Sequence, residues 1–318
     1  MHILINGWFW GQSTTGSGQY LHRLVEHLAR METSTRFTLL TPKGRDWGLG
    51  TGDWDSDAQS PISNLQSPVP NLPRQLAKLY WEQIAVPAAA RRLGADLLFV
   101  PYWAAPFWQP VPTVVTVHDL IPLLLPLYRG DILNRLYTGL VSITARRAAA
   151  IITVSQAGAQ DVTTHLHIPA ARISPVHHGP NVEEKDQQDP SSHNDIHTKY
   201  GLPARYFLYL GGFDARKNVE GILAAYRRYL DKGGDPAVKL VLAGKLPQRD
   251  TPFFPDPRRM AAALKLTEQV HYAGWVDEAD KPALYSGATA YLFPSHYEGF
   301  GMMLLEAMAA GCPVITSR

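Results

Sequence analysis

One segment near the C-terminus constrains the fold of this chain more than any other. An apolar run over 288–293 is typical of a buried strand, the loop 294–301 contains two glycines, and 302–311 is rich in the helix formers Met, Leu, Glu and Ala. Another strand begins at 313–316. A strand, a glycine loop, a helix and a strand in this order predict a parallel sheet with a helix N-terminus at its carboxyl edge.

Two carboxylates flank that helix N-terminus. Glu298 lies at the mouth of the loop and Glu306 follows eight residues later, so a rotation of about 100° per residue lets both lean toward one side. The unpaired N–H groups and the positive dipole end of a helix suit an anion, and carboxylates suit sugar hydroxyls. The segment therefore predicts a sugar-nucleotide site. The alternative is that both acids have no binding role, with Glu298 as a turn residue and Glu306 as a solvated helix residue.

The composition is that of an ordinary globular protein large enough for two domains. The 318 residues are 45% hydrophobic and 18% charged, and the net charge of +2 favours neither nucleic acid nor an acidic partner. Cys312 is the single cysteine, which excludes an intrachain disulfide. We find no signal-peptide pattern and no apolar run long enough to span a membrane, and therefore expect a cytoplasmic protein.

Alternating strand and helix patterns run through the chain twice. The first run covers 1–182, a polar stretch over 183–200 is predicted to be a linker, and the second run covers 201–318. The stretch 41–73, rich in Gly, Ser, Asp and Pro, is expected to be a surface excursion. The pattern predicts an α/β protein of two doubly wound Rossmann-like domains that face each other across a cleft.

A second glycine loop lies in the first predicted domain. The loop 7–19 contains Gly16 and Gly18 and precedes a helical pattern, but Leu21 stands where a dinucleotide fingerprint has its third glycine. Such a loop either lets the backbone approach a phosphate or a sugar closely, or is only a flexible connection.

Two further features lie at predicted strand ends of the first domain. His118 and Asp119 leave the strand 113–117 at its carboxyl end, where ligands bind in open α/β sheets, and this favours a functional role for the pair. Aromatic residues gather at 8–10 and 101–108. Packing beneath the loops is the simpler explanation of these rings, and a wall for an acceptor sugar or lipid is the alternative.

The motifs together are similar to those of a known family. The string from Glu298 to Glu306 closely resembles the Glu-x7-Glu signature of retaining glycosyltransferases of family 4 (glycosyl transferases group 1), which have the GT-B fold. The segment 211–218 resembles that family's Gly-x-x-x-x-Arg-Lys-Asn pattern, and 116–120 resembles its His-Asp segment. The chain is most similar to the subgroup of mannosyltransferases and related hexosyltransferases of polysaccharide assembly.

The resemblance implies that the second domain holds most of the donor. Glu306 would bind the ribose hydroxyls of the nucleotide, and Glu298 would bind the hexose. Lys217, with Arg216, would bind the diphosphate, and His118 would contact the hexose from the first domain. The implied site consists of the catalytic residues His118 and Glu298 and the donor-binding residues Gly16, Gly18, Arg216, Lys217, Gly299, Phe300, Gly301 and Glu306.

The resemblance also defines the expected reaction and its partners. We expect a hexose, with mannose favoured, to move with retention of configuration from a GDP- or UDP-sugar to a glycan or lipid-linked acceptor. Neither a cofactor nor a metal ion is expected. A lipid-linked acceptor would bring the protein to the inner face of the membrane as a peripheral protein.

Two alternatives remain open. The chain ends a few residues after the predicted helix, where the family continues, so we expect a C-terminal truncation and an incomplete second domain. A truncated chain would allow a non-catalytic remnant that only binds a nucleotide sugar. A GT-B sugar-nucleotide epimerase is the other alternative, although epimerases are not expected to combine the Glu-x7-Glu string with Arg216 and Lys217.

Overall fold

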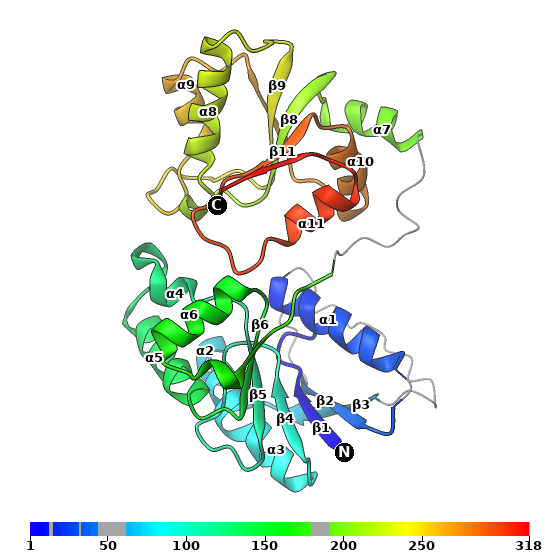
Figure 1. Cartoon of the computed structure of the whole chain (residues 1–318). Helices are drawn as coiled ribbons and strands as arrows, with labels where there is room; N and C mark the ends of the chain where they lie inside the picture. Colours follow the sequence, from blue (N-terminus) through cyan, green and yellow to red (C-terminus); the bar gives the residue numbers. More distant parts are fainter. Residues whose placement is uncertain (13–14, 32, 44–61, 180–190, 318) are drawn as a thin grey trace. The chain divides into compact units, whose positions relative to one another are not determined.

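The structure is a computed structural model that describes residues 1–12, 15–31, 33–43, 62–179 and 191–317, without the side chains of 191–195. The chain divides into two compact units, Met1–His177 and His178–Arg318. Each unit contains a parallel sheet with helices on both faces (Figure 1), which confirms the predicted α/β class with two Rossmann-like folds.

In the first unit, the described strands form one parallel sheet in the order β3-β2-β1-β4-β5-β6-β7. The strands are β1 (His2–Asn6), β2 (Arg36–Lys43), β3 (Ile62–Pro68), β4 (Leu97–Val100), β5 (Thr113–Val117), β6 (Ala150–Thr153) and β7 (Ile173–Pro175). From β1 the chain proceeds outward to β2 and β3 and then returns to β4 on the other side of β1. The connection after β1 leads to one side of the sheet and the connection after β4 leads to the other. The carboxyl ends of β1 and β4 therefore border the switch point, where open α/β sheets bind ligands.

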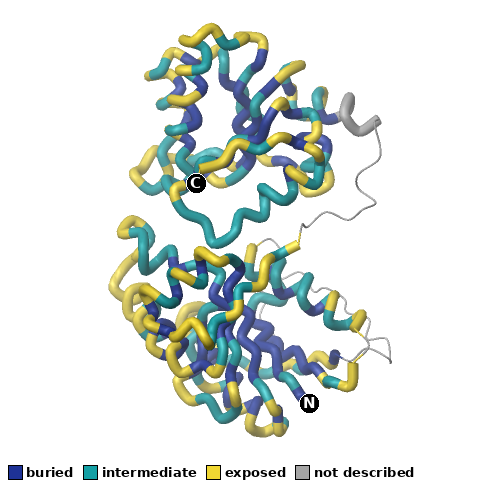
Figure 2. The backbone as a smooth tube through the Cα atoms, in the orientation of Figure 1, coloured by how far each residue is buried: buried dark blue, intermediate teal, exposed yellow. Residues whose placement is uncertain are grey.

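Helices cover both faces of this sheet. They are α1 (Gly16–Ala29), α2 (Arg74–Tyr80), a π-helical turn (Trp81–Ala85), α3 (Val86–Arg92), α4 (Ile121–Leu124), α5 (Ile132–Ala145) and α6 (Gln156–Leu166). Leu4 and Ile5 are neighbours in β1 but enter separate cores, because strand side chains alternate between faces. The core around Ile5 includes Leu21 of α1, and the core around Leu4 includes Trp81 and Val141. Figure 2 shows these buried strands between the helices.

The second unit repeats the design with the strand order β10-β9-β8-β11-β12. Its strands are β8 (Arg205–Leu210), β9 (Val238–Ala243), β10 (Val270–Gly274), β11 (Ala290–Phe293) and β12 (Val314–Thr316). Its helices are α7 (Ser191–Tyr200), α8 (Val219–Asp231), α9 (Pro257–Ala263), α10 (Lys281–Ser286) and α11 (Met302–Ala309). The switch point of this sheet lies between β8 and β11, because the chain passes outward through β9 and β10 before it returns to β11.

The structure differs from the sequence prediction in two connecting segments. Residues 191–200 of the predicted linker form α7, and the buried side chain of Ile196 packs in a core of the second unit; residues 183–190 lie outside the described part. Ile62–Pro68 of the predicted surface excursion form β3, which pairs with β2 at the sheet edge. Most β3 side chains are at least partly exposed, so the strand lacks the apolar run by which buried strands are identified.

Candidate active site

A cluster of charged side chains lies at the switch point of the second sheet. Glu298 forms two ion pairs. Lys217 Nζ lies 2.7 Å from its Oε1, and Arg216 Nη1 lies 2.6 Å from its Oε2. Arg216 and Lys217 belong to a 3-10 turn after β8, and Glu298 belongs to the loop after β11. The three side chains are only 12 to 20% exposed. The structure therefore brings together the cations and the acid that the sequence predicts for one site.

Backbone and amide contacts fix the two loops against each other. Asn218 adopts a left-handed conformation with φ of 55°, which asparagine tolerates better than most residues, and its Oδ1 accepts a hydrogen bond from the N–H of Gly221 at the start of α8. Its Nδ2 donates to the carbonyl of Pro294 at 3.0 Å. The N–H of His296 donates to the carbonyl of Arg216 at 2.8 Å. These bonds fix the loop that carries Arg216 and Lys217 against the loop that carries Glu298.

The cluster keeps Glu298 ionised. Burial acts to raise the pKa of Glu298, but the charges of Lys217 and Arg216 outweigh burial and hold the pKa below its ordinary value. Lys217 Nζ also lies 5.1 Å from the ring centre of Phe293, the last residue of β11, where the ring face favours a cation. The site thus presents an ionised carboxylate held between Lys217 and Arg216.

The N-terminus of α11 lies in the same loop. Gly301 precedes the helix with φ of 101°, a conformation that favours glycine, and a Cβ there would approach Leu304 Cδ1 to 3.0 Å. A glycine has no side chain with which to cap the first N–H groups of α11. Gly299, Phe300 and Gly301 are all half-buried at this end of the helix. The position suits a negatively charged group.

Glu306 has a different partner from Glu298. It is half-buried within α11, and its Oε2 accepts a hydrogen bond from the hydroxyl of Tyr285 at 3.3 Å. Tyr285 is buried on α10, and both its burial and the charge of Glu306 raise the pKa of its hydroxyl, which therefore stays protonated as a donor. The sequence prediction missed Tyr285 because this tyrosine lies in a short helix that carries no recognised motif.

Close backbone packing beneath the cluster depends on Gly244. It follows β9 with φ of 130°, and a Cβ there would lie 2.1 Å from the carbonyl oxygen of Gly211 after β8. Only glycine allows the turns after β8 and β9 to approach this closely. The signal for Gly244 in the sequence is a glycine directly after an apolar strand, which is too common to mark a site.

In the first unit, His118 lies directly after β5. Its Nε2 contacts the carbonyl oxygen of Pro101 at 3.1 Å, and because a carbonyl only accepts, Nε2 carries the proton. Burial lowers the pKa of His118, although the Pro101 carbonyl and Asp119 oppose the shift. The ring of Tyr20 meets the His118 ring edge-on at 4.7 Å. At neutral pH His118 is therefore an uncharged hydrogen-bonding group.

The two predicted glycines occupy different environments at the start of α1. A Cβ on Gly18 would lie 1.9 Å from the carbonyl oxygen of Gln12, so packing alone requires glycine there. The N–H of Gly18 donates to the Thr15 hydroxyl that caps α1. A Cβ on Gly16 would meet no atom within 4 Å among the described residues. Residues 13 and 14 of this loop lie outside the described part.

The predicted site residues thus fall into two groups, one in each unit. The first unit contains Gly16, Gly18 and His118, and the second contains Arg216, Lys217, Gly299, Phe300, Gly301, Glu298 and Glu306. That these groups face one another across a cleft stays a prediction. The aromatic residues divide as well, since Trp8 and Tyr102 are buried, whereas Phe107 and Trp108 are about half exposed.

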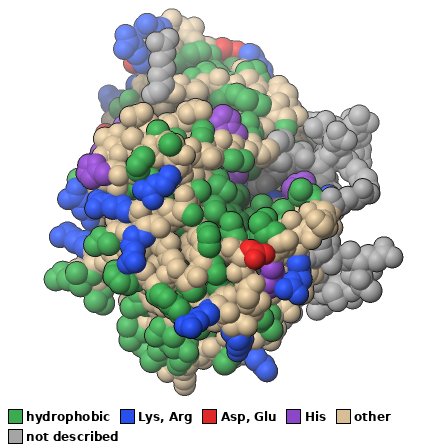
Figure 3. Space-filling view, turned by 60° about the horizontal axis from the view of Figure 1, so that its bottom comes forward, with side chains coloured by type: hydrophobic (Ala, Val, Ile, Leu, Met, Phe, Trp, Pro, Cys, Tyr) green, Lys and Arg blue, Asp and Glu red, His purple; other side chains and the backbone are tan. Residues whose placement is uncertain are grey.

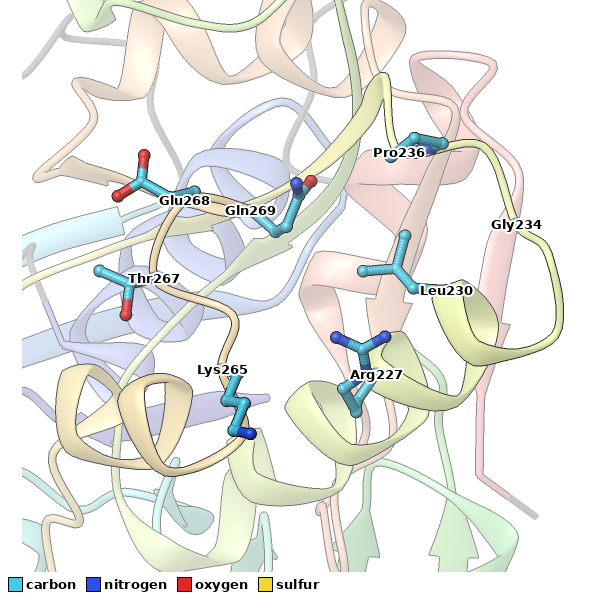
Figure 4. Close-up of a pocket in the computed structure, with 8 residues that line it drawn as sticks. All are labelled: Arg227, Leu230, Gly234, Pro236, Lys265, Thr267, Glu268 and Gln269. Carbon is cyan, nitrogen blue, oxygen red and sulfur yellow. The ribbon is translucent and has the colours of Figure 1, made fainter.

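A surface hollow of about 460 Å³ lies elsewhere in the second unit (Figure 4). Its lining includes Arg227 and Leu230 of α8, and Lys265 and Gln269 before β10. These segments lie at the amino edge of the sheet, opposite the edge that carries Lys217. The hollow contains none of the predicted site residues.

Comparison with known proteins identifies the family. Residues 14–184 match the profile of Glycosyltransferase Family 4, and residues 194–318 match that of Glycosyl transferases group 1. The chain belongs to Glycosyltransferase Family 4.

Relatives and a solved structure extend this result. The O-antigen chain mannosyltransferase B of Escherichia coli is 29% identical over 308 residues, which are 96% of this chain and 79% of that protein. The serotype-specific mannosyltransferase WbdA of Escherichia coli is 32% identical over 219 residues, which are 66% of this chain but 26% of WbdA, so the chain matches about a quarter of that relative. A sucrose-phosphate synthase from Thermosynechococcus elongatus has a TM-score of 0.67 at 21% identity, covering 99% of this chain and 81% of that chain, which confirms the GT-B fold.

Proposed function

We propose that this chain is a retaining glycosyltransferase that moves a hexose from a nucleoside-diphosphate sugar to a glycan or lipid-linked acceptor. The observation that carries the proposal is the cluster of Arg216, Lys217 and Glu298 beside the N-terminus of α11. The proposed donor is a GDP- or UDP-sugar. Mannose is the first hexose to test, because both relatives are named mannosyltransferases.

The chemistry explains why such a cluster is useful. When the bond between the anomeric carbon and the diphosphate breaks, negative charge develops on the phosphate and positive charge on the sugar. Arg216 and Lys217, with the dipole of α11, would stabilise the first charge, and Glu298 the second. The acceptor oxygen would bond to the anomeric carbon on the face that the phosphate leaves, and its proton would pass to the departing phosphate.

The proposal includes neither a cofactor nor a metal ion. Arg216 and Lys217 place two positive charges at the proposed diphosphate site, which is the role that a divalent cation has in other phosphate sites. Turnover of the nucleotide sugar is therefore expected to be the same with and without EDTA. An EDTA-sensitive rate that Mg²⁺ or Mn²⁺ restores would contradict this expectation.

Glu306→Ala is expected to weaken binding of the free nucleoside diphosphate about tenfold, because Glu306 would accept hydrogen bonds from the ribose hydroxyls. Glu298→Ala is expected to weaken binding of the nucleotide sugar but not of the nucleoside diphosphate, since Arg216 and Lys217 remain. Calorimetric titration with GDP, GDP-mannose, UDP and UDP-glucose measures both effects. Tyr285→Phe is a control that removes a hydrogen bond to Glu306 but keeps the carboxylate. Equal losses for both ligands in both acid variants would refute this assignment.

We also propose that the protein acts at a membrane surface as a peripheral protein. No described helix has the length and apolarity to cross a bilayer. However, Ile132, Leu133 and Leu136 on α5 are 63 to 73% exposed, beside the exposed Arg129 and Arg135. The face shown in Figure 3 carries both hydrophobic and basic side chains. Apolar side chains flanked by arginines fit the surface of a bilayer that contains anionic lipids.

Replacement of Ile132, Leu133 and Leu136 by serine together is expected to abolish flotation of the protein with vesicles that contain phosphatidylglycerol, because the apolar anchor is lost. Leu76→Ser is the matched control, since Leu76 on α2 is 52% exposed. Flotation of the triple variant at the wild-type level would exclude this surface.

The enzymatic proposal is tested with a panel of GDP- and UDP-sugars, measuring release of the nucleoside diphosphate and the shift in melting temperature. We expect at least one donor to stabilise the protein and to release its nucleoside diphosphate. Binding without release, on any acceptor tried, would favour the non-catalytic remnant. Neither binding nor release would refute the proposed function.

A further inference from the structure

A buried carboxyl group lies in the first unit, outside the donor site. Glu82 has no exposed surface and belongs to the π-helical turn Trp81–Ala85 between α2 and α3. Tyr137 of α5 donates from its hydroxyl to both carboxylate oxygens of Glu82, at 3.0 and 2.9 Å. Lys78, one turn earlier on α2, places its Nζ 3.5 Å from Oε1. Three helical segments thus converge on one carboxyl group.

This ion pair is costly as a purely structural element. Removing two charges from water costs several kcal/mol per ion. Replacing a buried ion pair by apolar side chains of similar volume often leaves the stability unchanged or increases it by about 1–4 kcal/mol. The π-helical turn adds a second departure from regular structure, and such turns occur frequently at functional sites. Both features point to a role for Lys78 and Glu82 beyond packing.

Lys78 connects the buried carboxyl group to the protein surface. Its side chain is 26% exposed, and its Nζ lies over the rings of Phe9, Tyr102 and Tyr137 at 5.4, 5.4 and 4.9 Å from their centres. The Phe9 and Tyr102 rings also meet edge-on at 4.8 Å. Phe9 is only partly buried, so one apolar ring with exposed surface lies next to a lysine side chain that also keeps some exposed surface.

The position of this group in the sheet is that of a ligand site. Phe9 follows β1 and Tyr102 follows β4, and the carboxyl ends of these two strands border the switch point of the first sheet. Asn6, the last residue of β1, joins the two connections. Its Nδ2 donates to the Tyr102 hydroxyl at 2.9 Å, and its Oδ1 accepts from Trp81 Nε1 at 2.8 Å. The lysine is therefore held where the fold places ligands.

We propose that Lys78 and the ring of Phe9 bind the acceptor, a neutral sugar ring, and that Glu82 acts as a positioning residue that orients Lys78. This inference rests on the proposed glycosyltransferase function. An ammonium group donates hydrogen bonds to sugar hydroxyls, and an aromatic ring packs against the apolar face of a sugar. When Glu82 is ionised, its charge offsets that of Lys78, and a pair without net charge favours a neutral polyhydroxyl group over a phosphate.

If Glu82 positions Lys78, binding of the acceptor should depend on the protonation of Glu82 and therefore on pH. Burial raises the pKa of Glu82 to about 7, against the effects of Lys78, Tyr137 and Tyr102, which are the titratable groups facing it from α2, α5 and the segment after β4. Below that pH the protonated carboxyl no longer fixes the ammonium group of Lys78. The KM for the acceptor is therefore expected to rise as pH falls through about 7 in the wild type, and this step should be absent from Glu82→Gln.

The test uses the full chain with free mannobiose as the neutral acceptor probe and mannose 6-phosphate as the anionic one. We expect Lys78→Met to raise the KM for mannobiose about tenfold or more, because a charge-assisted hydrogen bond is lost. Release of the nucleoside diphosphate without acceptor should stay within about twofold of wild type, because the donor residues are intact. Lys43→Met, at an exposed lysine of β2, is the matched control. Phe9→Leu, which keeps the apolar bulk, should also raise the KM for mannobiose if Lys78→Met does not fold.

The outcomes separate this inference from the proposed function. An unchanged KM for mannobiose in folded Lys78→Met or Phe9→Leu, with donor turnover intact, would overturn the acceptor site alone. The same holds if the wild type uses donor but prefers mannose 6-phosphate to mannobiose. No release of nucleoside diphosphate by the wild type from any donor would overturn both proposals.

Discussion

Lys217→Ala is expected to lower kcat/KM for the nucleotide sugar about a hundred- to a thousandfold. In other enzymes, removal of one preorganised group that stabilises charge in the transition state has an effect of this size. The reason is that Lys217 and Arg216 are the two cations held together at the switch point of the second sheet. Initial rates of nucleoside diphosphate release, over a range of donor concentrations, measure the change.

The matched control for this experiment is Lys232→Ala. Lys232 is exposed at the C-terminal end of α8, in the same unit, and we expect its replacement to leave kcat/KM unchanged. A similar fall in both variants would indicate a general charge effect. An unchanged rate in Lys217→Ala would remove Lys217 from the proposed diphosphate site.

Glu298→Ala is expected to lower the free energy of unfolding by about 2 kcal/mol, because it leaves Lys217 and Arg216 without their shared counter-charge. Fully buried pairs lose about 3–5 kcal/mol on such a change, and the smaller value reflects the 12 to 20% exposure of these side chains. Urea unfolding measures the loss. Glu268→Ala, at an exposed position before β10, is expected to change the stability little. Equal losses in both variants would contradict the importance of the cluster.

The pH dependence of this contribution follows from the direction of the pKa shift. Folding lowers the pKa of Glu298 from its ordinary value of 4.5, so its contribution is complete above pH 4.5 and is lost as pH falls through the lower pKa of the folded state. The difference in stability between the wild type and Glu298→Gln is therefore expected to be constant at neutral pH and to shrink in acid. A difference that instead shrinks between pH 6 and 8 would show that another group titrates.

The repeated strand and helix pattern was enough to predict the fold, because buried parallel strands are apolar throughout and their loops contain glycine. The edge strand β3 and helix α7 could not be predicted in this way. Most β3 side chains are at least partly exposed, and α7 is a mostly polar segment in which the buried Ile196 provides an apolar contact. Both elements depend on tertiary contacts, with β2 and with the second core, that local sequence does not contain.

The charged residues of the second unit were predictable because the segments 211–218 and 298–306 resemble motifs of a known family. Their mutual arrangement was not, since the pairing of Glu298 with both Arg216 and Lys217 depends on the neighbouring positions of β8 and β11. Glu82 was missed for another reason. The structure places it in the π-helical turn Trp81–Ala85, and nothing in the local sequence shows that this turn directs the acid into the core. Its partner Tyr137 is far away in the sequence.

We propose that a nucleotide sugar binds at the cluster of Lys217, Arg216 and Glu298. A crystal structure of this chain with GDP-mannose or UDP-glucose tests it most directly. We expect phosphate oxygens within hydrogen-bond distance of Lys217 Nζ and of the first N–H groups of α11. Phosphates bound instead in the hollow beside Arg227 and Lys265, at the opposite edge of the sheet, would contradict it.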